Sequence, residues 1–164
     1  MGLDMYLYER TWCPRTYPQG KRTKKTNFTT NVYDYNGKTE KKKFNDVAYI
    51  YCRKGYWRKA NAIHQFFLDK RREEMSIDDC NGEDIYITRA DIEELKDICE
   101  NLLSFKGKKF KEKAEELLPV SQGFFWGSYE YDKWYRHDLK NTLKIIKGLN
   151  LDDPRVDVIY NANW

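Results

Sequence analysis

The sequence predicts a single α+β domain in which a small, mostly antiparallel sheet packs with three to four helices. Short segments with period-two alternation lie between longer segments that carry an apolar stripe of helical period. Their order shows no regular strand–helix–strand repeat, which argues against a parallel α/β sheet. The length of 164 residues suits one domain, residues 1–164. A basic β-hairpin is expected to project from it, as an insertion over residues 13–45.

The elements follow from local patterns in chain order. We expect strands at residues 3–10, 46–52, 85–88 and 156–161, a loop at 13–27, a hairpin of 28–35 with 38–44, and helices at 56–74, 88–103, 109–118 and 128–147. The strand segments alternate apolar and polar residues or form short apolar runs. Asn36-Gly37 supplies the two positive-φ residues of a type I′ turn, which favours the hairpin.

The helix ends carry residues that commonly cap helices. Thr88 and Asp91 form a capping-box pattern at the start of the second helix. Pro119 ends the third helix because proline cannot continue one. Ser128 is expected to cap the last helix, and Gly148 is expected to end it.

The composition favours a domain with a ring-rich core. Aromatic residues make up 16% of the chain, and 13 of them are tyrosines. Tyrosine and tryptophan have polar tips that need hydrogen-bond partners when they are buried. No stretch approaches the roughly 20 apolar residues needed to span a membrane. Asp4 stands where a signal peptide would be basic, so we expect a cytoplasmic protein.

Cysteine and histidine usage gives no indication of a metal or another cofactor. The four cysteines are far apart in the sequence, at positions 13, 52, 80 and 99, and the chain has only two histidines. Zinc sites normally need closely spaced ligands. We therefore expect reduced thiols, no metal ligands and no cofactor.

The positive charge is concentrated in residues 21–43. This segment holds eight Lys/Arg residues against Asp34 and Glu40, while the whole chain carries a net charge of +4. A basic segment of this kind is a candidate nucleic-acid contact, although it is often only a solvated loop. The candidate residues are Lys21, Arg22, Lys24, Lys25, Lys41, Lys42 and Lys43.

Two aromatic segments contain the candidate ligand-binding residues. In the helix expected after Gly55, His64 falls within the apolar arc and Asn61 at its rim, with Tyr56 on the core line. A histidine in this position usually has a structural role, and the alternative is a pocket walled by Trp57. The structural role and the ligand-binding role of His64 both stay open.

The second segment, residues 123–135, has glycines on both sides of three aromatic residues. Glu130 and Asp132 would occupy the first turn of the helix after Ser128 and repel an anion, which argues against a phosphate site. Trp134 is expected on the apolar face of this helix. Asp138 falls within the same face, so it is expected to have a hydrogen-bond partner.

Together these segments predict an aromatic-walled ligand pocket. The predicted ligand-binding residues are Trp57, Arg58, Asn61, His64, Tyr131, Tyr135 and Asp138. No phosphate-binding loop, dinucleotide fingerprint, nucleophile–base spacing or paired carboxylates are visible, so no catalytic residue is assigned.

Three stretches resemble a family of small, mostly uncharacterised proteins encoded by bacteriophages and prophages. They are MGLDMYLYER, WRKANAIHQFF and the block LLP…GFFWGSYEYDKWY…DLKNT, which together cover about half of the chain. The resemblance implies an accessory or host-takeover factor in the cytoplasm of an infected bacterium. These motifs carry no known chemistry, so the resemblance transfers no residue roles.

The leading hypothesis is a non-enzymatic phage accessory protein that binds a small, nucleotide-like ligand or a host protein, for example in counter-defence. Nucleic-acid binding through residues 21–43 is the first alternative. The second is a small enzyme that uses His64 as acid or base, with Asp138 or Asp4 as its orienting carboxylate. The expected partners are a small molecule or a host protein and not a membrane, and the oligomeric state stays open.

Overall fold

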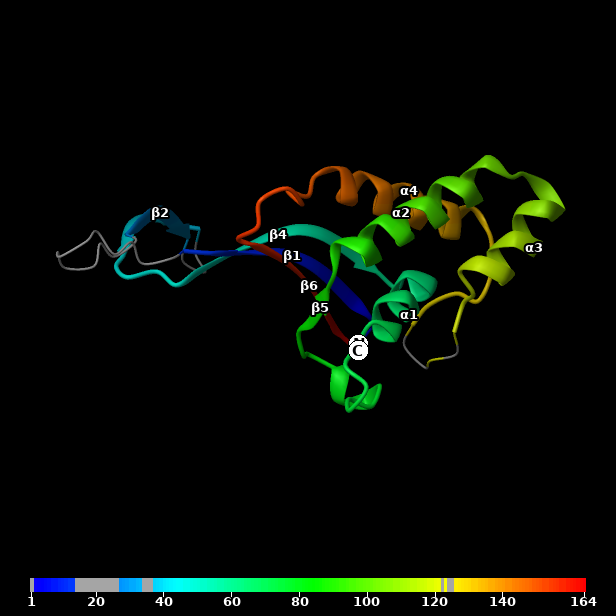
Figure 1. Ribbon diagram of the computed structural model, residues 1–164, viewed down its shortest axis with the longest axis horizontal. Helices are drawn as coiled ribbons and strands as arrows, with labels where there is room; N and C mark the ends of the chain where they lie inside the picture. Colours follow the sequence, from blue (N-terminus) through cyan, green and yellow to red (C-terminus); the bar gives the residue numbers. More distant parts are fainter. Residues whose placement is uncertain (1, 14–26, 34–36, 122, 124–125) are drawn as a thin grey trace.

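A four-stranded antiparallel sheet lies at the centre of the protein in a computed structural model, which describes residues 2–13, 27–33, 37–121, 123 and 126–164. Its strands are β1 (Asp4–Trp12), β4 (Tyr49–Arg58), β5 (Ile85–Ile87) and β6 (Val156–Asn163), in the order β4-β1-β6-β5. Strands β2 (Phe28–Tyr33) and β3 (Thr39–Phe44) form a separate hairpin beyond one end of the sheet (Figure 1).

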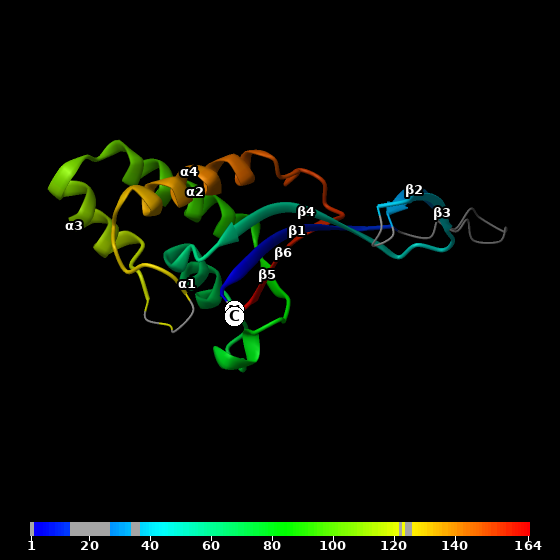
Figure 2. The same ribbon diagram turned by 180° about the vertical axis from the view of Figure 1, so that it is seen from behind.

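Four helices and one 3₁₀ turn complete the described fold. They are α1 (Asn61–Asp69), η1 (Asp78–Cys80), α2 (Arg89–Ser104), α3 (Gly107–Leu117) and α4 (Lys133–Lys147). Helices α2 and α4 lie side by side along one side of the sheet (Figures 1 and 2). The predicted α+β domain with its hairpin is confirmed. The turn at residues 34–36 lies outside the described residues, and Gly37 has the positive φ, +78°, that the predicted turn requires.

The core lies between the sheet and the helices. On β1, Leu3, Met5 and Leu7 are completely buried, as the alternation predicts. Tyr160 from β6 and Phe67 from α1 stack within this core, with ring centroids 4.4 Å apart. Because alternate residues of a strand point to opposite faces, the other face of the sheet carries the intervening residues.

The predicted helix over residues 56–74 is wrong, because β4 extends to Arg58. Pairing with β1 continues from Tyr49 to Arg58, and the chain then turns at Lys59, which has a φ of +59°. The helix is therefore limited to Asn61–Asp69. As a consequence Tyr56, expected in the core, is 43% exposed, and the neighbouring Trp57 is buried.

Gly55 marks a close approach between β4 and α4 and is not the start of a helix. A Cβ atom at this position would lie 2.6 Å from Cγ2 of Ile145. A side chain here would thus collide with α4, which explains a glycine in the middle of a strand. The register of β4 against β1 also shifts beside it, between Leu7 and Tyr8.

The last helix begins four residues later than predicted, since its cap is Asp132 and not Ser128. Asp132 caps it: its carboxylate accepts hydrogen bonds from the backbone N–H groups of Trp134 (2.8 Å) and Tyr135 (3.1 Å). Ser128 accepts a bond from the Glu130 N–H before the helix begins, so its predicted capping role is wrong. The later start leaves Trp134 62% exposed instead of in the core. Gly148 ends the helix as predicted.

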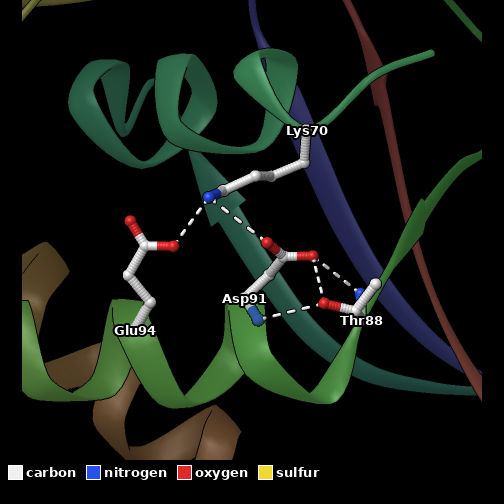
Figure 3. Close-up of polar contacts among 4 residues, drawn as sticks. All are labelled: Lys70, Thr88, Asp91 and Glu94. Carbon is white, nitrogen blue, oxygen red and sulfur yellow. Dashed lines mark hydrogen bonds and ion pairs between the residues drawn. The ribbon is translucent and has the colours of Figure 1, made fainter.

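The start of α2 is confirmed and is tied to the end of α1. Thr88 and Asp91 form the predicted capping box, in which the Asp91 carboxylate accepts from both the backbone N–H and the hydroxyl of Thr88 (Figure 3). Lys70 lies 3.2 Å from the other oxygen of Asp91 and 2.7 Å from Glu94. Both carboxylates raise the pKa of Lys70, the hydrogen bond to Glu94 most strongly.

Candidate functional site

His64 is enclosed among aromatic rings. Its side chain is completely buried, and its Nδ1 lies 2.6 Å from the hydroxyl oxygen of Tyr160. The rings of Trp126 and Trp164 meet it edge-on, with centroids 4.5 and 4.8 Å away. Burial lowers the pKa of His64 to about 3, so the imidazole is neutral. No carboxylate of the described residues bonds to it, so the orienting partner that an acid–base role needs is not seen there.

Three other predicted site residues hold the chain that follows α3. The Asn61 amide makes two hydrogen bonds to the backbone of Ser121, of 2.6 and 2.7 Å. The Tyr131 hydroxyl accepts from the N–H of Val120, and the Tyr135 hydroxyl donates to the carbonyl of Leu118 at 2.7 Å. Their polar atoms are therefore already used within the described structure.

Asp138 lines a small cavity together with Asn61 and Tyr135. The volume of this cavity is about 50 Å³, enough for about one or two water molecules. Burial, reinforced by the charge of Asp132, raises the pKa of Asp138 to about 7. Within the described part of the chain its carboxylate has no hydrogen-bond partner, contrary to expectation.

The remaining two predicted residues lie elsewhere. Trp57 is in the core, where its indole N–H donates to the Thr142 hydroxyl at 3.0 Å. Arg58 lies on the opposite face of the sheet, 3.3 Å from Asp4. The structure therefore brings Asn61, Tyr135 and Asp138 to one cavity and does not gather all seven residues there.

The face of the sheet turned away from the helices carries most of the exposed tyrosines. We call it the tyrosine face and define it by its rings, Tyr6, Tyr8, Tyr49, Tyr51, Tyr56 and Tyr86. The strand register places Tyr56 beside Tyr6, and Tyr51 beside Arg10. Four of these rings, those of residues 49, 51, 56 and 86, are between 43% and 53% exposed.

Three rings of this face, those of Tyr6, Tyr8 and Tyr56, contact one another. Tyr6 lies 6.1 Å from Tyr8 and 5.4 Å from Tyr56, measured between ring centroids. The Tyr56 hydroxyl donates to Asp4 at 2.5 Å, and this bond raises the pKa of the phenol. Ile159, which pairs with Tyr8, is completely buried although it belongs to this uncovered face. The tyrosines therefore shield the sheet themselves.

Arg10 orders the middle of the tyrosine face. Its guanidinium lies 4.7 Å from the ring centroid of Tyr49 and 4.8 Å from that of Tyr86. It also forms an ion pair with Asp157 at 2.5 Å. Arg10 and Arg58 therefore neutralise the two carboxylates of this face that they contact.

A hollow opens where the tyrosine face meets the edge strand β4. It has a volume of about 490 Å³ and is lined by Tyr6, Arg53, Lys54, Gly55 and Tyr56. This volume is within the range of small-ligand sites. Lys54 pairs with the buried Glu9 at 2.8 Å. Arg53 has no hydrogen-bond or ion-pair partner among the described residues, so its guanidinium is available to an anion.

Sequence reasoning did not identify this face as the site because it assigned Tyr56 and Arg58 to a helix. The sequence of residues 49–58 nevertheless contains a pattern that indicates a strand. From Tyr49 every second residue is a tyrosine or an arginine, at positions 49, 51 and 53, and this period-two pattern returns at 56 and 58 after one extra residue. A bulge accounts for that shift, because it inserts a residue without changing the face.

Three of the seven predicted basic residues can be placed. Lys41, Lys42 and Lys43 lie exposed on β3. Lys21, Arg22, Lys24 and Lys25 lie outside the described residues. Within the described residues no group of three His, Cys, Asp or Glu side chains is arranged to hold a metal ion, and no helix there is long and apolar enough to cross a membrane. Comparison with family models, curated proteins and solved structures gives no match for this chain.

Proposed function

We propose that the tyrosine face binds, without catalysis, a ligand that carries both a nucleobase and a phosphate group. The observation that carries this proposal is the hollow at β4. It combines the Tyr6–Tyr56 ring pair, the guanidinium of Arg53, which has no partner among the described residues, and a volume of about 490 Å³. This is the nucleotide-like version of the ligand-binding hypothesis, moved from the helices to the open sheet.

Aromatic rings and guanidinium groups of the tyrosine face are suited to the two parts of such a ligand, the base and the phosphate. Every base has a π-face, and stacking of one base on an aromatic side chain contributes roughly 1–3 kcal/mol. A guanidinium is planar and donates two parallel hydrogen bonds to phosphate oxygens. Because Arg10 and Arg58 already neutralise Asp157 and Asp4, these two carboxylates repel an incoming phosphate less.

A host protein remains the other version of the hypothesis, because tyrosine and arginine are also enriched in protein interfaces. The position of Arg53 in a ligand-sized hollow, without a partner in the described part of the chain, favours the nucleotide. The enzyme alternative gains no support from His64, whose ring is buried and bonded to Tyr160. A phage origin stays a prediction.

The proposal is tested by calorimetric titration with nucleoside mono- and diphosphates and cyclic dinucleotides. The key comparison is Tyr56→Thr with Tyr56→Phe. Threonine keeps the strand propensity and removes the ring, whereas phenylalanine keeps the ring and loses the bond to Asp4. We expect Tyr56→Thr to weaken binding about 5- to 150-fold, the equivalent of 1–3 kcal/mol, and Tyr56→Phe to retain most of the affinity.

The phosphate contact is tested by Arg53→Gln, with Lys111→Gln on the distant α3 as the charge-matched control. Trp134→Ala removes an exposed ring away from the tyrosine face and controls for Tyr56→Thr. Arg53→Gln should weaken binding of the phosphorylated ligand and leave that of the bare nucleoside unchanged. The proposal is wrong if no nucleotide binds, or if the control variants weaken binding as much as the variants of the hollow.

A further inference from the structure

The hairpin lies beyond one end of the tyrosine face. Trp12, the last residue of β1, pairs with Tyr49, the first residue of β4, and both side chains are about half exposed. Figures 1 and 2 show strands β2 and β3 lying beyond this end of the sheet, away from all four helices. A long ligand that leaves the face at Tyr49 would therefore meet the hairpin.

The surface of the hairpin combines cations with rings. Lys41, Lys42 and Lys43 are consecutive on β3 and exposed. Phe28 and Phe44 pair across the two strands, and each is 39% exposed. The Lys42 ammonium lies 5.6 Å from the ring centroid of Phe44. Cations interleaved with exposed aromatic rings are typical of surfaces that bind single-stranded nucleic acid.

We infer that the ligand is a single-stranded nucleic acid that runs along the tyrosine face and onto the hairpin. This inference rests on the proposed function, because it extends the same site. Alternate residues of a strand are about 7 Å apart, so Tyr6, Tyr8 and the rings at the Tyr49 end offer successive stacking positions. A mononucleotide would use the hollow alone and leave the other rings and the lysines without a role.

A single strand fits this surface better than a duplex does. Bases within a duplex are already stacked and paired, so they cannot lie on tyrosine rings without being unpaired. Sheets that present aromatic side chains to two or three bases are a known solution for single strands. The lysines then contact the phosphates beyond the stacked bases, which predicts strong dependence on salt.

The inference is tested by fluorescence anisotropy with labelled thymidine and uridine oligonucleotides of 4, 8 and 12 nucleotides, and with a 12-base-pair duplex. We compare the wild type with the triple variant Lys41→Gln, Lys42→Gln, Lys43→Gln. The matched control is Lys106→Gln, Lys109→Gln, Lys111→Gln at the α3 end of the molecule. Because successive side chains of β3 point to opposite faces, we expect one or two of the three lysines to contact the same strand, and their removal should reduce the slope of log K against log salt by about one. The affinity of the variant relative to wild type should then fall about tenfold as the salt is lowered from 1 M to 0.1 M.

The expected result is tighter binding of the 12-mer than of the 4-mer, loss of that advantage in the hairpin variant, and weaker binding of the duplex. If nucleotides bind but the 12-mer binds no tighter, or the hairpin variant behaves like wild type, the inference is wrong and the proposed function stands. An equally tight duplex also overturns the inference. If oligonucleotides bind through the lysines and Tyr56→Thr has no effect, the proposed function is wrong. Lack of binding by any nucleotide overturns both.

Discussion

Two buried ionisable side chains, His64 and Asp138, have pKa values that burial shifts in opposite directions. Burial keeps His64 neutral, with a pKa of about 3 instead of 6.5. Burial also raises the pKa of Asp138 from 3.8 to about 7, so this carboxyl group stays protonated over a wider range of pH. His64 therefore contributes stability above pH 6.5 that is lost on acidification. Asp138 contributes stability at low pH that is lost as the pH rises through 7. Between pH 3.8 and 6.5 the two dependences oppose each other.

We expect Asp138→Asn to stabilise the protein at alkaline pH. At pH 8 the wild type holds a largely buried carboxylate without a described partner, and the amide removes this charge. The free energy of unfolding should rise by about 1 kcal/mol at pH 8, less than the full linkage value because the carboxyl is partly solvated. At pH 5 the gain should be small. Urea unfolding at both pH values measures it, with the exposed Asp97→Asn as control. A loss of stability at pH 8 would contradict this account.

Once Asp138 is replaced, the contribution of His64 can be measured. We expect the stability of Asp138→Asn to fall by about 2 kcal/mol between pH 7.5 and pH 5, because the unfolded histidine gains a proton that the buried ring does not accept. Adding His64→Gln should remove most of this dependence. The readout is the change with pH and not the absolute stability, which His64→Gln also lowers. An unchanged pH dependence in the double variant would show that the ring is protonated in the fold.

At the scale of elements, strand pairing, helix caps and close contacts between elements decide where each strand and helix begins and ends, more than helix propensity does. β4 continues through Tyr56 and Trp57 because β1 offers a partner along the whole strand. Lys59, with positive φ, then turns the chain into α1. The segment between Gly127 and Asp132 remains non-helical before α4 begins.

We expect Asp132→Ala to destabilise the protein by about 1 kcal/mol, since it removes a side chain that accepts hydrogen bonds from two N–H groups at the start of α4. Ser128→Ala should have little effect, because Ser128 contacts only the N–H of Glu130. Thermal and urea unfolding of the two variants measure the difference. Equal losses, or a larger loss for Ser128→Ala, would place the start of the helix at the position predicted from sequence.

For the whole molecule, the four-stranded sheet with its helices is one unit and the hairpin is an appendage. Among the described residues, no hydrogen bond, ion pair or ring contact joins β2 or β3 to the other elements. A backbone hydrogen bond of 2.8 Å between Cys13 and Ala48 closes the base of the insertion. We therefore expect the stability of the body not to depend on the hairpin, and the nucleic-acid affinity that we infer to depend on it.

Replacing residues 14–47 with a short Gly-Ser linker should leave the Tm within about 2 °C of wild type, because the linked ends are already close and shortening a loop has only a small entropic effect. Calorimetry measures the Tm. Oligonucleotide affinity should fall in the same variant, while binding of a mononucleotide at the Tyr56 hollow is retained. A fall in Tm of 10 °C or more would show that the insertion is part of the folded core.

Sequence patterns predicted the strands and helices that local chemistry specifies. The alternation of residues 3–10, the capping box at Thr88 and the hairpin at Gly37 were each recognisable, because each depends on neighbouring residues only. Asp138 was correctly placed toward the buried side of α4, but the hydrogen-bond partner expected for it is not found among the described residues, because partners come from distant segments.

The sequence by itself determined the fold class, the buried face of β1 and the basic character of the hairpin, because periodicity and composition are local properties. Only the tertiary structure decided which face of the sheet stays open. That choice depends on pairing of β4 with β1, whose partners lie between 37 (Trp12 and Tyr49) and 54 (Asp4 and Arg58) positions apart in the chain, and on Ile145 of α4 filling the space at Gly55. It moved Tyr56 and Arg58 from an expected helix to an open face and enclosed His64, for the physical reason that long-range contacts outweigh local propensity.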